Sequence, residues 1–136
     1  MLQFSKRSDY ALQLLIALSR LGDGEYLGLR QFSKESSISF LFLQRIARSL
    51  RLSGLIGSKQ GARGGYCLMA PRADVTLRDI VEAVEGPVAI VSCLKDGNRC
   101  PLDHACASRT VFTQIRGHVL EYIDDIRLSD LAEKIL

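Results

Sequence analysis

The fold of this chain is decided by residues 39–69, which read SFLFLQRIARSLRLSGLIGSKQGARGGYCLM. The first part predicts a helix with Ser39 as its N-cap and its end near Leu52. After Leu52 the spacing of apolar residues changes from that of a helix to that of strands. The segments Leu55–Lys59 and Gly65–Met69 predict an antiparallel hairpin with a glycine-rich loop. One face of the helix is apolar at helical spacing and is expected to be buried: Leu43, Ile46, Ala47 and Leu50.

Further helices are predicted on both sides of this stretch. In chain order they cover Ser8–Leu21, Leu29–Ser36, Thr76–Gly86, Ser108–Ile126 and Ser129–Leu136, with Ser8, Thr76 and Ser129 as N-caps. Thr76 with Asp79 three residues later predicts a capping box at the start of its helix. Three helices followed by a two-stranded hairpin are the order of a winged helix-turn-helix. We therefore expect a mainly α fold, in which a winged helix-turn-helix carries a two-stranded wing and a long C-terminal helix.

Charge divides the chain into two unlike halves. The 136 residues carry 18 Lys and Arg against 15 Asp and Glu, a net charge of +3. Residues 1–72 hold 11 of the basic and 4 of the acidic residues, a balance of +7, while residues 73–136 hold 7 and 11, a balance of −4. A basic first half predicts an anionic partner for that half. We divide the chain into a DNA-binding domain (1–87), a cysteine-rich loop (88–107) and a helical C-terminal part (108–136).

The outer face of the Ser39 helix carries side chains that suit the bases of DNA. Gln pairs bidentately with adenine, Arg pairs with guanine, and an apolar side chain can touch a thymine methyl group. The hairpin adds basic residues among glycines, where an Arg can enter a narrow minor groove. The alternative is an ordinary solvated basic surface beside a connecting hairpin. The predicted DNA-binding residues are Ser39, Leu41, Gln44, Arg45, Arg48, Lys59 and Arg63.

Three of the four cysteines lie close together in a loop. Cys93, Cys100 and Cys106 have the spacing C-x6-C-x5-C and are interrupted by Gly and Pro. No signal peptide or membrane-spanning segment is recognisable, so we expect a cytoplasmic protein with reduced thiols. Three thiolates wrapped around one centre favour an iron–sulfur cluster over structural zinc, which prefers C-x2-C pairs. A thiol-disulfide switch and free cysteines remain alternatives, and Cys67 is expected only to fill space in its strand.

Several segments together identify a family resemblance. The stretches SDYAL (8–12), GARGGY (61–66) and LSDL (128–131), with the cysteine loop, are similar to the Rrf-type (IscR/NsrR-like) bacterial transcription regulators. The resemblance implies a homodimeric winged-helix repressor or activator whose long helix is the dimerisation helix. It also implies an iron–sulfur cluster in the loop, and control of genes for cluster assembly, iron, nitric oxide or redox stress.

The resemblance leaves the fourth cluster ligand open. IscR-like members place a His three residues after the last cysteine, where this chain has Arg109. NsrR-like members use an Asp in the first helix of the other subunit, and the matching residue here is Asp9. Asp9 can equally be a helix-start residue favoured by the macrodipole; His104 and Asp103 are alternatives within the loop. The residues do not decide between a 2Fe–2S and a 4Fe–4S cluster.

An enzyme is not expected. The chain has two histidines, both in its second half, and offers no recognisable nucleophile and base pair. We expect a repressor with double-stranded DNA and a second copy of the chain as partners, and with neither a membrane nor a small-molecule substrate. Its DNA affinity would be gated by the cluster, or, as the alternative, by a thiol-disulfide or zinc switch without iron.

Overall fold

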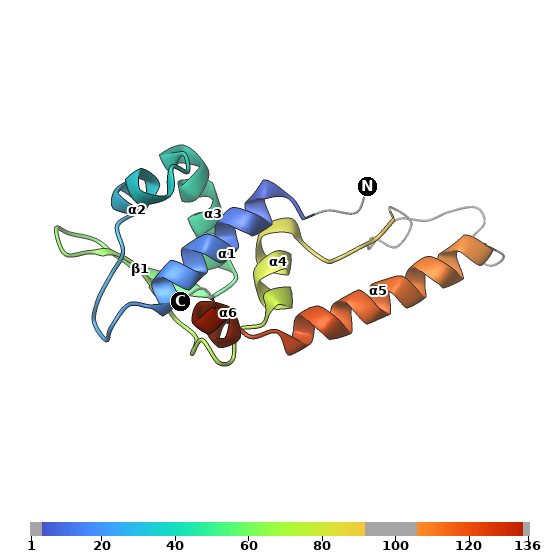
Figure 1. Ribbon diagram of the computed structural model, residues 1–136. Coiled ribbons are helices and arrows are strands. Elements are labelled where there is room, and N and C mark those ends of the chain that lie inside the picture. The colour runs from blue at the N-terminus through green and yellow to red at the C-terminus, as the bar shows by residue number, and fades with distance from the viewer. Residues whose placement is uncertain (1–3, 92–105, 135–136) are drawn as a thin grey trace.

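The computed structural model describes residues 4–91 and 106–134, which form six helices and one hairpin (Figure 1). The mainly α winged helix-turn-helix predicted from the sequence is confirmed by this element order. The elements are α1 (Lys6–Ser19), α2 (Leu29–Ser36), α3 (Phe40–Leu52), β1 (Ile56–Lys59), β2 (Gly65–Leu68), α4 (Leu77–Glu85), α5 (Ala107–Asp125) and α6 (Leu128–Lys134).

One hydrophobic core joins the first four helices, the hairpin and α6. Helix α1 packs against α3, α4 and α6, and α3 packs against α2, α4 and β1. The apolar face of α3 is buried as its spacing predicts, with Leu43 and Leu50 fully inaccessible. The largest fully buried side chains come from all parts of this body: Leu14, Leu15, Leu43, Ile46, Leu50, Ile56, Val75, Ile80 and Leu128.

Helix α1 begins three residues before the predicted position. Its N-cap is Ser5, whose extended backbone lets the side-chain oxygen accept a hydrogen bond from the amide of Arg7. The hydroxyl of Ser5 also contacts the carboxylate of Glu85 at the end of α4. The prediction of Ser8 as N-cap is wrong, because Ser8 is buried in the first turn of the helix. The hydroxyl of Ser8 has no hydrogen-bond partner among the described residues.

The turn between α2 and α3 contains no glycine. Ser37 adopts a left-handed conformation with φ 61°, the one non-glycine residue with positive φ in the described ranges. The hydroxyl of Ser33 donates a 2.6 Å hydrogen bond to the carbonyl oxygen of Ile38, and the Ile38 side chain is buried. These contacts fix the angle at which α3 leaves α2.

The wing is anchored to the segment that precedes α2. Strands β1 and β2 pair antiparallel from Ile56–Leu68 to Lys59–Gly65, and Tyr66 also pairs with Leu27. Gly65 has φ +142°, and a Cβ atom there would lie 2.5 Å from the carbonyl oxygen of Leu27. Only glycine permits this close approach, so Gly65 joins the wing to the body.

Helix α4 begins with the predicted capping box and receives the end of α5. Thr76 accepts from the amide of Asp79, whose carboxylate accepts from the amide of Thr76. The amide of Leu77 donates to the carbonyl of Ile126 at 2.9 Å, next to an isolated bridge between Thr76 and Arg127. The tail helix α6 therefore begins at Leu128, and the predicted cap at Ser129 is wrong because Ser129 already lies inside the helix.

Helix α5 projects away from this body (Figure 1). It begins at Ala107, directly after Cys106, and Ile123 is the one buried residue among its 19. The contacts that it makes with the rest of the body come mainly from α4. No helix among the described residues is both long and apolar enough to span a membrane.

Candidate nucleic-acid interface and cysteine segment

The outer face of α3 is free to contact a partner. Leu41 is 59% exposed, and Gln44, Arg45 and Arg48 are exposed on the same side of the helix. None of these four side chains forms a hydrogen bond or ion pair with the described residues. The helix thus presents two guanidinium groups and one amide opposite a fully apolar inner face, which is the division that a major-groove reading helix requires.

Ser39 stands at the start of the same face. It occupies the N-cap position, as predicted, but its side chain makes no capping hydrogen bond. Ser39 is exposed, and its hydroxyl is therefore available to an external acceptor.

The wing presents the two predicted basic residues in different ways. Arg63 is exposed near the tip, whereas the ammonium nitrogen of Lys59 lies 5.6 Å from the ring centroid of Tyr26. This contact is a cation–π interaction that restrains the lysine side chain. Tyr26 has no recognisable signal in the sequence, because it precedes α2 and reaches the wing only through the Leu27–Tyr66 pairing.

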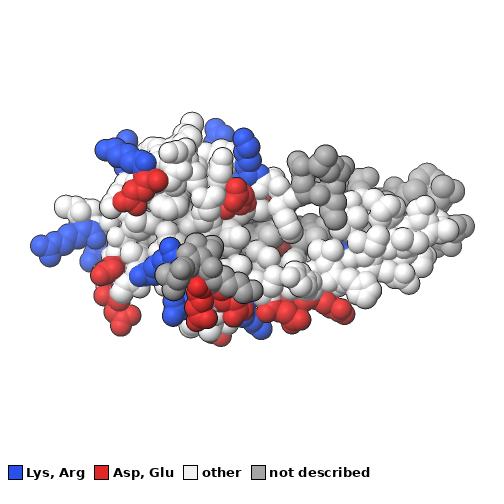
Figure 2. Space-filling model, viewed as in Figure 1, with Lys and Arg blue, Asp and Glu red and all other residues white. Residues whose placement is uncertain are grey.

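Charged side chains of both signs lie on the face of the molecule seen in Figure 2. Figure 2 shows blue Lys and Arg side chains at the end that holds α2, α3 and the wing, with some red acidic side chains among them, and a group of mostly red acidic side chains along the lower edge beneath the inner end of α5. At that inner end Arg78 donates to Glu82 and to Asp124, each at 3.1 Å. These hydrogen bonds, first that to Glu82 and then that to Asp124, raise the pKa of Arg78 above its ordinary value.

The structure describes only part of the predicted cluster site. Cys106 is a half-buried free thiol just before α5, while Cys93, Cys100 and His104 lie outside the described residues. Asp9 is exposed on the first turn of α1, where its carboxylate accepts a 3.0 Å hydrogen bond from Gln13. Within residues 4–91 and 106–134 no three His, Cys, Asp or Glu side chains converge on one point.

Asp9 and Cys106 of one chain lie far apart. In Figure 1 the start of α1 is on the compact body, while the first residues of α5 are at the outer end of the projecting helix. The two residues therefore do not form one site within a single chain in this arrangement.

An apolar groove runs between α4 and α5. Its volume is about 670 Å³, and Val81, Val88 and Tyr122 are among the residues that line it. The carbonyl of Val88 accepts a 2.7 Å hydrogen bond from Arg116 of α5, which holds the segment that leads toward the cysteine loop against the helix. Sequence patterns did not reveal this groove, because it forms between segments distant in the chain.

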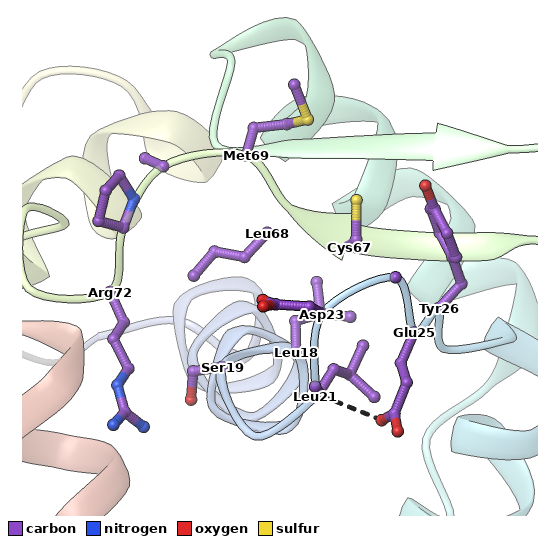
Figure 3. Close-up of a pocket in the computed structure, with 14 residues that line it drawn as sticks. Leu18, Ser19, Leu21, Asp23, Glu25, Tyr26, Cys67, Leu68, Met69 and Arg72 are labelled. Atoms are coloured by element: carbon purple, nitrogen blue, oxygen red, sulfur yellow. Dashed lines mark hydrogen bonds between the residues drawn. The ribbon is translucent and has the colours of Figure 1, made fainter.

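A second, smaller hollow of about 370 Å³ lies between the end of α1 and β2 (Figure 3). Glu25 accepts a hydrogen bond there from the backbone amide of Gly22, which closes the turn after α1. Cys67 lines this hollow as a half-buried residue of β2. Among the residues that the structure describes, neither hollow contains a converging set of metal-ligating side chains.

Comparisons with known proteins agree on one family. A family model described as "Rrf2: Iron-dependent Transcriptional regulator" matches residues 4–134. The protein rrf2 of Nitratidesulfovibrio vulgaris is 28% identical over 130 residues, which cover 96% of this chain and 87% of that protein. CymR of Bacillus subtilis, described as the global cysteine regulator, has a solved structure with TM-score 0.80 and 31% identity, covering 98% of both chains. An oxidised form of Staphylococcus aureus CymR has TM-score 0.75 and 28% identity, covering 97% of both chains.

Proposed function

The chain belongs to the Rrf2 family of transcriptional regulators, and from this membership we propose that it is a cytoplasmic homodimeric repressor gated by an iron–sulfur cluster. Its regulator family makes it a DNA-binding protein and not an enzyme. The cluster, the dimer, the sign of regulation and the contact residues are the proposed parts.

The main support for the proposed DNA-binding surface is the exposed outer face of α3. Gln44, Arg45 and Arg48 stand exposed and uncommitted over a buried apolar face. Ser39 and Leu41 extend the same surface, and Lys59 and Arg63 flank it from the wing. A helix of this kind enters the major groove while the wing contacts the neighbouring backbone or minor groove.

Helix α5 supports the homodimer. Val111 is 53% exposed, Ile115 is 38% exposed and Tyr122 is 70% exposed, at spacings that place them along one stripe. Water-exposed apolar stripes of this length mark protein interfaces. A second copy of α5 with the same stripe fits a two-fold dimer, in which one patch meets its own copy.

The donor set near α5 suits an iron–sulfur cluster. Cys106 is a free thiol at the outer end of α5, and Cys93 and Cys100 precede it by at most thirteen residues in the sequence. Thiolates are the usual ligands of such clusters, whose redox state and stability respond to oxidants and nitric oxide. If Asp9 is the fourth ligand, it would come from the second copy, since α1 of the same chain begins on the body and Cys106 lies at the outer end of α5; His104 and Asp103 are the alternatives within the loop.

Anaerobic purification after expression with iron and sulfide supply tests the cluster. We expect a coloured protein with visible sulfide-to-iron absorption, and we expect Cys93→Ser, Cys100→Ser and Cys106→Ser each to lose it. Cys67→Ser is the matched control and should keep the cluster, since Cys67 lies in the wing. Full cluster in all three loop variants would refute the ligand assignment.

Gating requires a second measurement. Holo and apo protein should differ in affinity for an operator selected from genomic fragments by about 5- to 150-fold, the range of ordinary allosteric coupling. Equal DNA affinity of the holo and apo forms would refute the gating proposal. Asp9→Ala separates first-helix ligation from ligation within the loop, because only the former loses the cluster.

A thiol switch is the second candidate function. It is favoured by the similarity to CymR, one structure of which is an oxidised form, and by the free thiol of Cys106. This candidate predicts a colourless anaerobic protein whose DNA affinity changes when loop thiols are oxidised. Metal analysis of the same sample distinguishes a zinc site from a metal-free switch.

A further inference from the structure

Arg30 and Phe40 form a contact that neither the predicted site nor the family match assigns. Arg30 is the second residue of α2, and Phe40 is the first residue of α3. The guanidinium carbon of Arg30 lies 4.3 Å from the centroid of the Phe40 ring. The contact therefore joins the beginnings of the two helices that make up the helix-turn-helix.

The Phe40 ring restrains Arg30 without using its hydrogen-bond donors. A guanidinium over an aromatic face is held by the charge of the ring's π electrons, and its N–H groups stay available at the edge of the plane. Phe40 is half-buried and packs against the core, which limits the positions that its ring can take. Arg30 is exposed and has no carboxylate partner among the described residues, and Glu35 of the same helix is engaged by Gln31.

The contact lies next to the proposed reading face. Phe40 lies between Ser39 and Leu41, the first two exposed residues of that face. In helix-turn-helix proteins the helix before the reading helix crosses the DNA backbone. A restrained guanidinium at this place matches the bidentate geometry of a phosphate.

We propose that Arg30 contacts a DNA phosphate beside the groove that α3 enters, and that Phe40 is the positioning residue that holds its guanidinium. This inference rests on the proposed DNA-binding function and adds a contact outside α3 and the wing. A phosphate contact carries no sequence information, so Arg30 strengthens binding to every duplex equally.

Fluorescence anisotropy with a labelled random-sequence duplex of about 30 base pairs, long enough for two half-sites, tests the inference. Binding is measured at several salt concentrations for the full chain and for Arg30→Ala, Arg30→Lys, Phe40→Leu and the double variant Arg30→Ala/Phe40→Leu. Arg127→Ala is the matched control, because it removes the same charge from an exposed position at the start of α6. Circular dichroism confirms that each variant is folded at the assay temperature.

Arg30→Ala should weaken binding by about threefold to tenfold, and the slope of log affinity against log salt should fall by about 0.9 per protomer. Phe40→Leu should weaken binding by about twofold to fivefold through the lost cation–π contact. The double variant should bind no more weakly than Arg30→Ala, since Phe40 acts through Arg30. Arg30→Lys should keep the salt slope and lose part of the affinity.

Three outcomes would overturn the inference. The first is an Arg30→Ala protein with unchanged affinity and slope, and the second is additive losses in the double variant, which would give Phe40 a merely structural role. The third is an equal loss in Arg127→Ala, which would reduce the effect to net charge. If the unaltered chain binds neither this duplex nor any genomic fragment, the proposed function fails as well, and the two failures are thereby distinguished.

Discussion

The compact body and the projecting helix α5 differ in how much of their apolar surface they bury. In the body, α3 buries every residue of its apolar face, and Leu43 and Leu50 are completely inaccessible. Helix α5 has a comparable number of apolar residues but buries Ile123 alone, and leaves Tyr122 70% exposed. The body thus has a complete hydrophobic core. Helix α5 instead carries an apolar stripe that the described residues leave largely uncovered.

Stability of a single chain and assembly of two chains therefore depend on different regions. Substitutions in the body should change the free energy of unfolding of a single chain. Substitutions on the stripe of α5 should leave that quantity almost unchanged and change the oligomeric state instead. Four substitutions test this division, and their expected effects on the free energy of unfolding decrease from Leu43→Ala to Ile115→Gln.

Leu43→Ala should give the largest effect. Removing a fully buried leucine from α3 loses its transfer free energy and leaves a cavity, so the free energy of unfolding should fall by about 2–5 kcal/mol. Urea denaturation followed by circular dichroism measures it. A loss below about 1 kcal/mol would mean that the body is loosely packed and that the comparison with α5 is overstated.

Thr76→Ala probes the junction at which the two regions meet. It removes one hydrogen bond of the capping box at α4, next to the backbone contact that receives the end of α5. The free energy of unfolding should fall by about 0.5–2 kcal/mol. Hydrogen exchange should show faster opening of both α4 and the inner end of α5, and Thr76→Ser should restore protection.

Ser8→Ala should stabilise the chain slightly. The Ser8 hydroxyl is buried without a partner among the described residues, and alanine also has the higher helix propensity. The free energy of unfolding should rise by about 0.5–1 kcal/mol, measured by the same denaturation. Ser5→Ala is the contrasting variant, and because Ser5 is the true N-cap its substitution should lower stability.

Ile115→Gln should have the smallest effect on a single chain, within about 0.5 kcal/mol, because the side chain is already 38% exposed. Analytical ultracentrifugation should nevertheless show a dimer in the unaltered protein and dissociation in the variant. Thr113→Gln, an exposed position on another side of α5, should leave the dimer intact. A dimer that survives Ile115→Gln at low micromolar concentration would place the interface elsewhere.

The sequence was sufficient for elements whose signals are local and repeated. The inner face of α3, the two strands and the Thr76–Asp79 capping box were predicted correctly, since spacing and hydrogen-bonding chemistry act within a few residues there. The exposure of the predicted reading residues also follows from helical period. Their contact with DNA stays a prediction.

Sequence patterns did not predict features that depend on a choice between two similar residues or on contacts between distant segments. Ser5 and Ser8 are the same residue type three positions apart, and the choice of cap was decided by the packing of α1, which buries Ser8. Likewise Leu128 rather than Ser129 begins α6, because Leu128 is drawn into the core beside Val75. The groove beside Tyr122 and the Arg30–Phe40 contact arise from tertiary packing. The spacing of residues in a single sequence does not indicate such contacts.

The projection of α5 has a mechanical consequence. At 1.5 Å per residue its 19 residues form a lever about 28 Å long. The pivot is the inner end, where Ile126 bonds to Leu77 and Arg78 bonds to Asp124. A displacement of about 5 Å beside Cys106 at the outer end corresponds to a rotation of about 10° at the pivot. A small displacement at the outer end would thereby become a rotation of the body that carries α3 and the wing.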